Sequence, residues 1–397
     1  MKNAKKRIVM LLGSDFIHPY PDPRVYKEAK SMVENGYDIS VVCWCKDGSD
    51  LPDTEIYEGI NISRVFQKAP HYRAVFLWRL PFYALYILKS VRKTIKLRPD
   101  AVHCHDLDTL MIGVIVKLLR RKPLIFDAHE DYPSVLEGTY SRFFIRAARL
   151  FEKILIKMVD RVIAAEEPYV PIQQKHYGIT PVVIRNFPRL DGFHPAVDPS
   201  PVVSRYGLEG KTVISHIGIV GRARGIFETL EAIHSLDNAD IRLFIIGRAP
   251  ENVWDTIRET MNKLNLEKAV ILIEGGVDYK DIPLYYKASD ISLALLYPMP
   301  NYVTSIPTKL YESLAVGVPV LAGNLDYLSS IVTKYDVGLC ADSQDPADIA
   351  AKLGTMIADK AMRERMSRNG LKVIKEEFNW AESEKRLLGL YREILAK

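Results

Sequence analysis

A lysine and a glutamate three residues apart mark the segment of this chain best suited to bind a ligand. Pro307 precedes Lys309, Glu312 follows it, and an apolar stretch comes next. A first helical turn tolerates proline, and residues three apart share one helix face. The free N–H groups of this helix start, together with the lysine, would hold a phosphate, and the glutamate would accept hydrogen bonds from ribose hydroxyls. A surface ion pair is the alternative.

A glycine-rich turn upstream could hold the same kind of ligand. Gly218, Gly221 and Gly225 follow a predicted strand and open a helix, with Arg222 and Arg224 between the last two glycines. Small residues let the backbone approach a ligand and the arginines supply charge, so a diphosphate would fit. A turn with exposed arginines is the alternative. The glycine spacing does not match a dinucleotide fingerprint, and no P-loop is present.

Two further polar clusters and one more glycine turn follow predicted strands. His103, His105 and Asp106 end one strand, Asp127, His129, Glu130 and Asp131 end the next, and Gly275, Gly276 and Val277 follow the strand at 270–273, where backbone could face a nucleotide base. The carboxyl ends of parallel strands line ligand sites, where a histidine binds sugar hydroxyls or moves a proton and a carboxylate orients an acceptor hydroxyl.

The two histidines of the first cluster differ in their expected roles. His105, at the strand end, is the functional candidate, and His103 is expected to be buried and structural. Residues 103 and 105 face one side of a strand while Asp106 turns away, so the pattern predicts no metal site.

The composition is that of a folded globular protein and does not favour nucleic-acid binding. The sequence has 397 residues, 48% of them hydrophobic, and 54 Lys+Arg stand against 49 Asp+Glu. The charge balance is too even for nucleic-acid binding. Four scattered cysteines do not form a disulfide framework, which predicts a reducing, cytoplasmic compartment. The apolar run at 8–12 is too short for a signal peptide or a membrane span.

The elements that must position these residues alternate between strands and helices. Short apolar runs separated by helical periodicity predict an α/β fold of parallel strands and crossover helices. The predicted strands begin at Arg7, Asp38, Ala101, Leu124, Arg161, Thr212, Arg242, Val270, Ile291 and Val318. A proline-rich break predicts a first domain at 1–188, a linker at 189–199 and a second domain at 200–379. A final helix at 380–397 is expected to pack on the first domain.

Taken in order, these motifs resemble the family 4 glycosyltransferases of the GT-B fold over nearly the whole chain. The resemblance rests on segments 22–29 and 36–42, the histidine clusters, Arg224-Gly225, Ile246-Gly247-Arg248, 285–293 and 307–319. It implies two doubly wound Rossmann-like domains facing a central cleft, and transfer of a sugar from a UDP-, GDP- or ADP-sugar with retention of anomeric configuration. No metal or other cofactor is implied. The acceptor would be a saccharide or a lipid-linked molecule in cell-surface polysaccharide or glycolipid synthesis.

By position, the resemblance also implies residue roles. His105 would contact the transferred sugar, Arg224 and Lys309 the donor phosphates, and Glu312 the ribose. The predicted catalytic residues are His105, Arg224 and Lys309; the donor-binding residues are Gly218, Arg222, Arg224, Gly247, Gly276, Val277, Thr304, Ser305, Lys309, Leu310 and Glu312; the acceptor-side residues are Arg24, Asp127, His129 and Glu130.

Two positions depart from the family pattern. Thr304 replaces the first glutamate of a paired-glutamate motif, eight residues before Glu312, and Ile219 replaces an arginine after the first glycine of the turn. Arg222 is a possible substitute for that arginine. A catalytically degenerate scaffold subunit of the same fold is therefore one alternative, and a sugar-nucleotide 2-epimerase is another.

Two basic stretches predict contact with an anionic membrane. Residues 71–98 carry seven Lys/Arg and six aromatics with no acidic residue, and residues 140–158 place five basic residues on one helical stripe. Such segments suit peripheral attachment at the inner face of a membrane, near a lipid-linked acceptor. A core-packed helix with a solvated basic face is the alternative.

Overall fold

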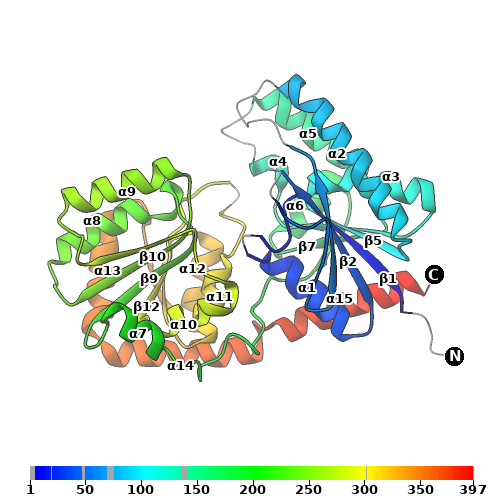
Figure 1. Cartoon of the computed structure of the whole chain (residues 1–397). Helices are drawn as coiled ribbons and strands as arrows, with labels where there is room; N and C mark the ends of the chain where they lie inside the picture. Colours follow the sequence, from blue (N-terminus) through cyan, green and yellow to red (C-terminus); the bar gives the residue numbers. More distant parts are fainter. Residues whose placement is uncertain are drawn as a thin grey trace. The chain divides into compact units, whose positions relative to one another are not determined.

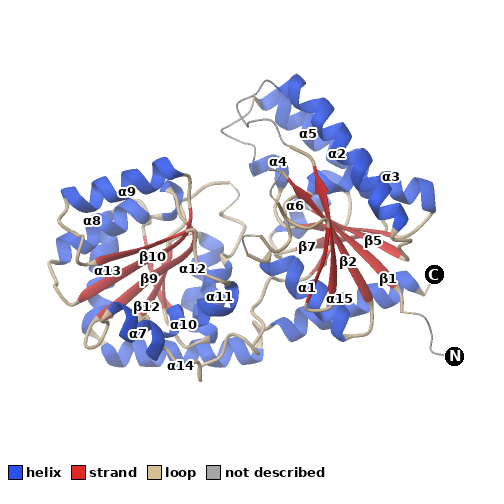
Figure 2. Cartoon of the chain, in the orientation of Figure 1, coloured by secondary structure: helices blue, strands red, loops and turns tan. Residues whose placement is uncertain are grey.

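The computed structural model describes residues 5–18, 20–46, 50–68, 76–135, 141–300 and 302–396, without the side chains of 76–80 and 134–135. The chain divides into two compact units (Figure 1). The first unit comprises Met1–Asn186 and Ser383–Lys397, and the second comprises Phe187–Glu382. Each unit is built on one sheet with helices on both of its faces, as Figure 2 shows.

The first unit holds an eight-stranded sheet in the order β3-β4-β2-β1-β5-β6-β7-β8. All neighbouring strands pair in parallel except β3, which is antiparallel to β4. The strands are β1 (Arg7–Leu12), β2 (Asp38–Cys45), β3 (Thr54–Tyr57), β4 (Ile60–Phe66), β5 (Ala101–His105), β6 (Leu124–Ala128), β7 (Arg161–Ala164) and β8 (Val182–Val183). The central strands are buried on both faces, which explains their continuous apolar runs.

The helices of the first unit are α1 (Pro23–Glu34), α2 (Phe76–Lys96), α3 (Leu107–Arg120), α4 (Tyr132–Val135), α5 (Arg142–Ile156) and α6 (Tyr169–Tyr177). The Asp22 side chain caps α1 by accepting hydrogen bonds from the N–H groups of Arg24 and Val25, both at 3.0 Å. The last helix of the chain, α15 (Trp380–Leu395), continues into the first unit from Ser383 onward. Its Tyr391 is completely buried there.

The second unit holds a six-stranded, all-parallel sheet in the order β11-β10-β9-β12-β13-β14. Its strands are β9 (Thr212–Ile219), β10 (Ile241–Arg248), β11 (Val270–Glu274), β12 (Ile291–Ala294), β13 (Val320–Gly323) and β14 (Gly338–Ala341). Its helices are α7 (Ser200–Tyr206), α8 (Ile226–Leu236), α9 (Glu251–Lys263), α10 (Ile282–Lys287), α11 (Thr308–Ala315), α12 (Asp326–Tyr335), α13 (Pro346–Ala358) and α14 (Lys360–Glu376). Separate apolar cores lie on the two faces of this sheet.

The observed strands match most of the predicted ones. Eight of the ten predicted strands begin at the predicted residue; β10 begins at Ile241 and β13 at Val320, instead of Arg242 and Val318. Strands β3, β4, β8 and β14 were not predicted from the sequence. Residues 189–199, which the sequence predicts as a linker, lie within the second unit, and Phe193 is buried in its core.

None of the helices that the structure describes is long and apolar enough to cross a membrane. Of the stretch 71–98, residues 71–75 lie outside the described residues, as does residue 140 at the start of the other basic stretch.

Candidate functional site

The helix predicted to hold a phosphate is present in the second unit. Helix α11 begins at Thr308 with Pro307 as its N-cap residue, in an extended conformation. Lys309 and Glu312 are each only 6% exposed, so the alternative of a surface ion pair is wrong. The Glu312 carboxylate accepts a hydrogen bond from the hydroxyl of Tyr279 at 3.3 Å. A buried lysine and a buried glutamate on one short helix require partners that surface residues do not need.

The amine of Lys309 meets an imidazole that the sequence did not single out. Its Nζ lies 3.2 Å from Nε2 and 3.4 Å from Nδ1 of His216 on β9. Burial first, and then the nearby Arg224, hold the pKa of Lys309 well below its ordinary value, while Glu312 opposes this shift. Lys309 forms no ion pair with a carboxylate within the described part of the chain.

The two arginines of the glycine turn also lack carboxylate partners in the described ranges. They form the single helical turn η1 (Arg222–Arg224), where Arg224 lies over the ring of Tyr302 at 4.5 Å and Arg222 over Phe227 at 5.1 Å. Gly225 follows with φ 65°, and a Cβ there would lie 2.7 Å from Leu295 Cβ. Because aromatic faces leave the guanidinium N–H groups available, these arginines can still bind an anion.

Gly218 and Gly247 allow two strand ends to approach closely. They are register partners in the β9–β10 pair, and a Cβ on Gly247 would lie 1.6 Å from the carbonyl oxygen of Gly218. Only glycine fits there. Gly276, with φ 86°, and the half-buried Val277 follow β11 at the same carboxyl edge.

The remaining predicted donor residues differ in accessibility. Thr304 and Ser305 are half-buried in the turn before α11, and Ser305 N–H donates to the carbonyl of Tyr302 at 3.2 Å. Leu310 is completely buried in the apolar core, and its N–H donates to the carbonyl of Pro307. Its side chain is therefore a packing element and not a ligand contact.

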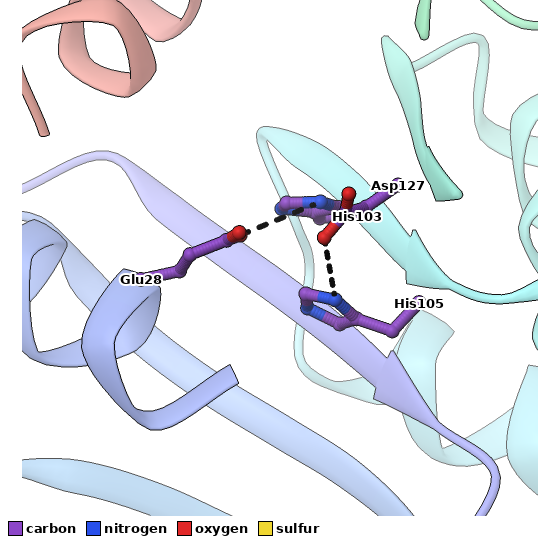
Figure 3. A group of neighbouring side chains, drawn as sticks. All are labelled: Glu28, His103, His105 and Asp127. Atoms are coloured by element: carbon purple, nitrogen blue, oxygen red, sulfur yellow. Dashed lines mark ion pairs between the residues drawn. The ribbon is translucent and has the colours of Figure 1, made fainter. Parts of the chain in front are cut away.

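The predicted acceptor-side residues of the first unit form a buried charged network. Arg24 donates to both carboxylate oxygens of Asp127, through Nε and a terminal nitrogen, each at 2.7 Å, and to the carbonyl of Ile184 at 2.8 Å. A terminal nitrogen of Arg24 also lies 3.4 Å from Glu28. Figure 3 shows Glu28 and Asp127 converging with the stacked imidazoles of His103 and His105.

His129 is the accessible histidine of this network. Its Nδ1 lies 3.1 Å from Asp106 and its Nε2 lies 3.1 Å from Asp127, so both nitrogens face carboxylates. Burial lowers the pKa of His129, but the two carboxylates outweigh burial and raise it well above the ordinary value. The side chain of His129 is 17% exposed, whereas that of His105 is completely buried. His129 is therefore a positively charged imidazolium directly after β6.

Asp106 adopts a backbone conformation that is rare for a residue with a side chain. It precedes α3 with φ 62° and ψ 168°. Such strained residues persist where surrounding contacts fix them, and they cluster at functional sites. The N–H of Asp106 donates to the carbonyl of Asp127 at 3.0 Å, and its carboxylate contacts His129. Asp106, with its strained backbone, thus helps to hold His129 in place.

The residues in Figure 3 also have the types and spacing of a metal site. Atoms of Glu28, His103, His105 and Asp127 lie within 4.8 Å of one another. Burial and the nearby Asp127 raise the pKa of Glu28 to about 8, so this carboxyl keeps its proton near neutral pH. The cations Arg24 and His129 then balance the carboxylates of Asp106 and Asp127. A divalent ion would add buried charge without a counter-charge, so these residues fit a metal ion poorly.

Three residues of the two sites were not predicted from the sequence: Glu28, Tyr391 and His216. Glu28 lies one helical turn after Arg24 on α1. His103 Nδ1 lies 2.8 Å from the hydroxyl of Tyr391, almost three hundred residues away along the chain. His216 stands two residues before Gly218, so strand alternation places both on one side of β9. The sequence offered a signal for Glu28 and His216 but none for Tyr391.

Glu130 lines a small pocket with Asp131, Glu152 and Gln173. Burial raises the pKa of Glu152 to about 7.

Comparison with known proteins places this arrangement in a class. Residues 24–190 match the model of Glycosyltransferase Family 4, and residues 205–373 match that of Glycosyl transferases group 1. The chain is 26% identical to the putative teichuronic acid biosynthesis glycosyltransferase TuaC of Bacillus subtilis, over 78% of each chain.

Solved structures share the fold. Sucrose-phosphate synthase from Thermosynechococcus elongatus superposes with a TM-score of 0.79 at 16% identity, covering 99% of this chain and 100% of the other. Anabaena Alr3699/HepE in complex with UDP and glucose gives a TM-score of 0.74 at 14% identity, covering 97% and 99%. The fold is that of the GT-B glycosyltransferases, a class that uses nucleotide-sugar donors. The chain belongs to glycosyltransferase family 4.

Proposed function

We propose that this enzyme transfers a sugar from a nucleoside diphosphate donor to a saccharide or lipid-linked acceptor, with retention of anomeric configuration. The observation that carries the proposal is the group of cations around the glycine turn and α11. Arg222, Arg224 and Lys309 have no ion-pair partner in the described ranges. A diphosphate supplies the missing negative charge, and Glu312 beside Tyr279 accepts hydrogen bonds from the ribose.

The proposed chemistry uses these charges. The bond between the anomeric carbon and the diphosphate oxygen breaks, and its electron pair stays on the departing oxygen. Arg224 and Lys309 stabilise this developing negative charge, as preorganised donors do in other enzymes. The acceptor oxygen bonds to the anomeric carbon on the same face, and its proton passes to the departing phosphate. No residue of the first unit is needed as a base.

The first unit is proposed to hold the acceptor side of the reaction and the transferred sugar. The family resemblance implies that His105 contacts the sugar, but His105 has no exposed surface in this structure. We assign this contact to the exposed edge of His129, with His105 behind it: His105 Nδ1 lies 3.1 Å from His129 Nε2. Arg24 and Asp127 are then positioning residues, and Glu130 is proposed to contact the acceptor.

A thermal-shift panel of UDP, GDP, ADP and their common sugar conjugates tests the donor site. A ligand that binds only the folded state raises its stability by mass action, so one nucleotide family should raise the melting temperature. Lys309→Ala should abolish the rise, and the exposed control Lys263→Ala should keep it. No shift with any nucleotide at millimolar concentration would reject the donor site.

A catalytically degenerate scaffold is the second candidate. Ile219, in the place of an arginine, is 65% exposed at the glycine turn, and Thr304 replaces a glutamate. A scaffold would bind nucleotide without turning over any sugar conjugate. Formation of a glycoside with retained configuration would exclude the scaffold and the 2-epimerase together.

We further propose attachment of the first unit to the inner surface of an anionic membrane. Helix α5 exposes Phe143 by 82%, Leu150 by 60% and Ile154 by 55%, beside exposed basic residues such as Arg146 and Lys153. Exposed apolar side chains among basic ones suit insertion at the level of lipid headgroups.

Co-sedimentation with vesicles tests the attachment. The protein should sediment with vesicles of mixed phosphatidylglycerol and phosphatidylcholine and stay in solution with phosphatidylcholine alone. Phe143→Ser with Ile154→Ser should release it. Failure to sediment with anionic vesicles even at low salt would remove membrane attachment while leaving the transferase proposal intact.

A further inference from the structure

His216 is a buried imidazole that contacts the proposed phosphate-binding lysine. It lies on β9, two residues before Gly218, and is 1% exposed. Its Nε2 lies 3.0 Å from the carbonyl oxygen of Ile219, and the Nζ of Lys309 lies 3.2 Å and 3.4 Å from its two ring nitrogens. The imidazole therefore stands between a backbone acceptor and a side-chain donor.

These contacts define the protonation state of the ring. A carbonyl oxygen only accepts, so Nε2 carries the hydrogen of a neutral ring. The Lys309 amine is almost equally distant from both ring nitrogens and therefore lies over the electron-rich face of the imidazole. A doubly protonated ring would place a second cation against Lys309. The other charged groups that face the pair are Arg224 and Glu312. Burial, followed by Lys309, holds the pKa of His216 well below its ordinary value, in agreement with a neutral ring.

The amine of Lys309 therefore lies against a neutral ring, and among the described residues Glu312 is the group that favours its ammonium form. Arg224 and burial both disfavour its ammonium form. A diphosphate would change this balance, because it brings negative charge to the amine and to Arg224 together.

We propose that His216 is a positioning residue of the donor site: it holds the Lys309 amine beside Gly218, and Lys309 takes up a proton when the donor diphosphate binds. This inference rests on the proposed function. The glycine turn carries Ile219 where relatives are expected to carry arginine, and the backbone carbonyl of Ile219 is what orients His216. A neutral aromatic ring thus supports the lysine at a turn where isoleucine stands in place of a cation.

Calorimetry measures both parts of the proposal. Binding of UDP, GDP and ADP is titrated in two buffers with different ionisation enthalpies at about pH 8, above the second phosphate pKa of about 6. The difference in observed enthalpy gives the number of protons taken up. Wild-type protein should take up a fraction of a proton with the nucleotide it binds, and Lys309→Arg, which keeps a cation that does not titrate, should bind without that uptake.

Variants of His216 separate positioning from packing. His216→Ala removes the ring that supports the amine and should weaken nucleotide binding about tenfold. His216→Phe, which keeps a ring face without a titrating nitrogen, should bind within about threefold of wild type and keep the proton uptake. His234→Ala, on the exposed side of α8, is the matched control. Circular dichroism and thermal unfolding confirm that each variant is folded.

The outcomes distinguish this inference from the proposed function. Nucleotide binding without proton uptake, or a folded His216→Ala that binds as tightly as wild type, would overturn the role of His216 and leave the donor site standing. Absence of binding by all three nucleotides would overturn the donor site and this inference with it.

Discussion

The two units of this enzyme manage buried charge in opposite ways. In the buried network of the first unit, the cations face carboxylates of the protein itself: Arg24 meets Asp127, and His129 lies between Asp106 and Asp127. In the second unit, Lys309 rests against a neutral imidazole and Arg224 against the ring of Tyr302.

This difference separates a site completed by folding from a site completed by its ligand. A buried pair that is satisfied internally contributes rigidity, and removing one partner leaves an uncompensated charge. Unpaired cations lower the stability of the free protein and gain most when an anion arrives. Structure and ligand binding should therefore respond to mutation differently in the two units.

The largest expected effect is on the stability of the first unit. Arg24→Met leaves the buried Asp127 without its bidentate partner and should lower the free energy of unfolding by about 3–5 kcal/mol. Urea unfolding measures the loss, with the exposed Arg92→Met as control. A loss below about 1 kcal/mol, typical of a surface pair, would show that the pair is not structural.

The next effect is on turnover. Lys309→Ala should lower turnover by two or more orders of magnitude, because removing one donor to a developing oxyanion costs about 3 kcal/mol. The same variant should be no less stable than wild type, since it removes a buried amine with no ion-pair partner in the described ranges. Turnover at the wild-type rate would reject the assignment of Lys309.

A smaller effect concerns pH. The pKa of Glu28 is raised to about 8 by burial and Asp127, against an unfolded value of about 4.3. The folded state then binds more protons than the unfolded state between these values, so this group makes stability fall as pH rises from about 4 to 8.

Glu28→Gln tests this pH dependence because glutamine resembles the protonated side chain. Stability of the variant, measured by urea unfolding at several pH values, should fall less steeply between pH 5 and 8, by up to about 1.4 kcal/mol for each pH unit. The exposed Glu34→Gln on the same helix should leave the slope unchanged. An equal slope in all three proteins would mean that Glu28 is ionised in the folded state.

The smallest effect should fall on the ribose contact. Glu312→Gln keeps the shape and one hydrogen-bond acceptor, so nucleotide affinity should fall about tenfold with little change in turnover of bound donor. Calorimetric titration of the nucleotide measures this loss. An unchanged dissociation constant would remove the ribose role of Glu312.

Sequence patterns predicted most of the strands because buried parallel strands are continuous apolar runs flanked by turns. The pattern failed at β3 and β4, where half-exposed residues alternate in a short antiparallel pair. At α11 the helix start and the shared face of Lys309 and Glu312 were predicted correctly, but their burial was not. Periodicity indicates which residues share a helix face, but it does not indicate which residues pack against that face.

The histidines of the first unit illustrate the same limit of prediction from sequence. Strand alternation placed His103 and His105 on one side of β5, yet it could not identify what faces them there. Tyr391 reaches His103 from the other end of the chain, and such long-range contacts leave no trace in local spacing. The choice between His105 and His129 likewise depended on exposure, which only the fold reveals.

The return of the C-terminal helix has a consequence for biosynthesis. The first unit comprises residues 1–186 and 383–397, so its Tyr391 leaves the ribosome only after the entire second unit has been made. Domains tend to fold in the order of their synthesis, but here the domain begun first is finished last. Until residues 383–397 emerge, His103 lacks its hydroxyl partner and the nascent first unit presents an unfinished surface. A premature stop codon within α15 would therefore disrupt the first unit, although most of that unit precedes the second unit in the sequence.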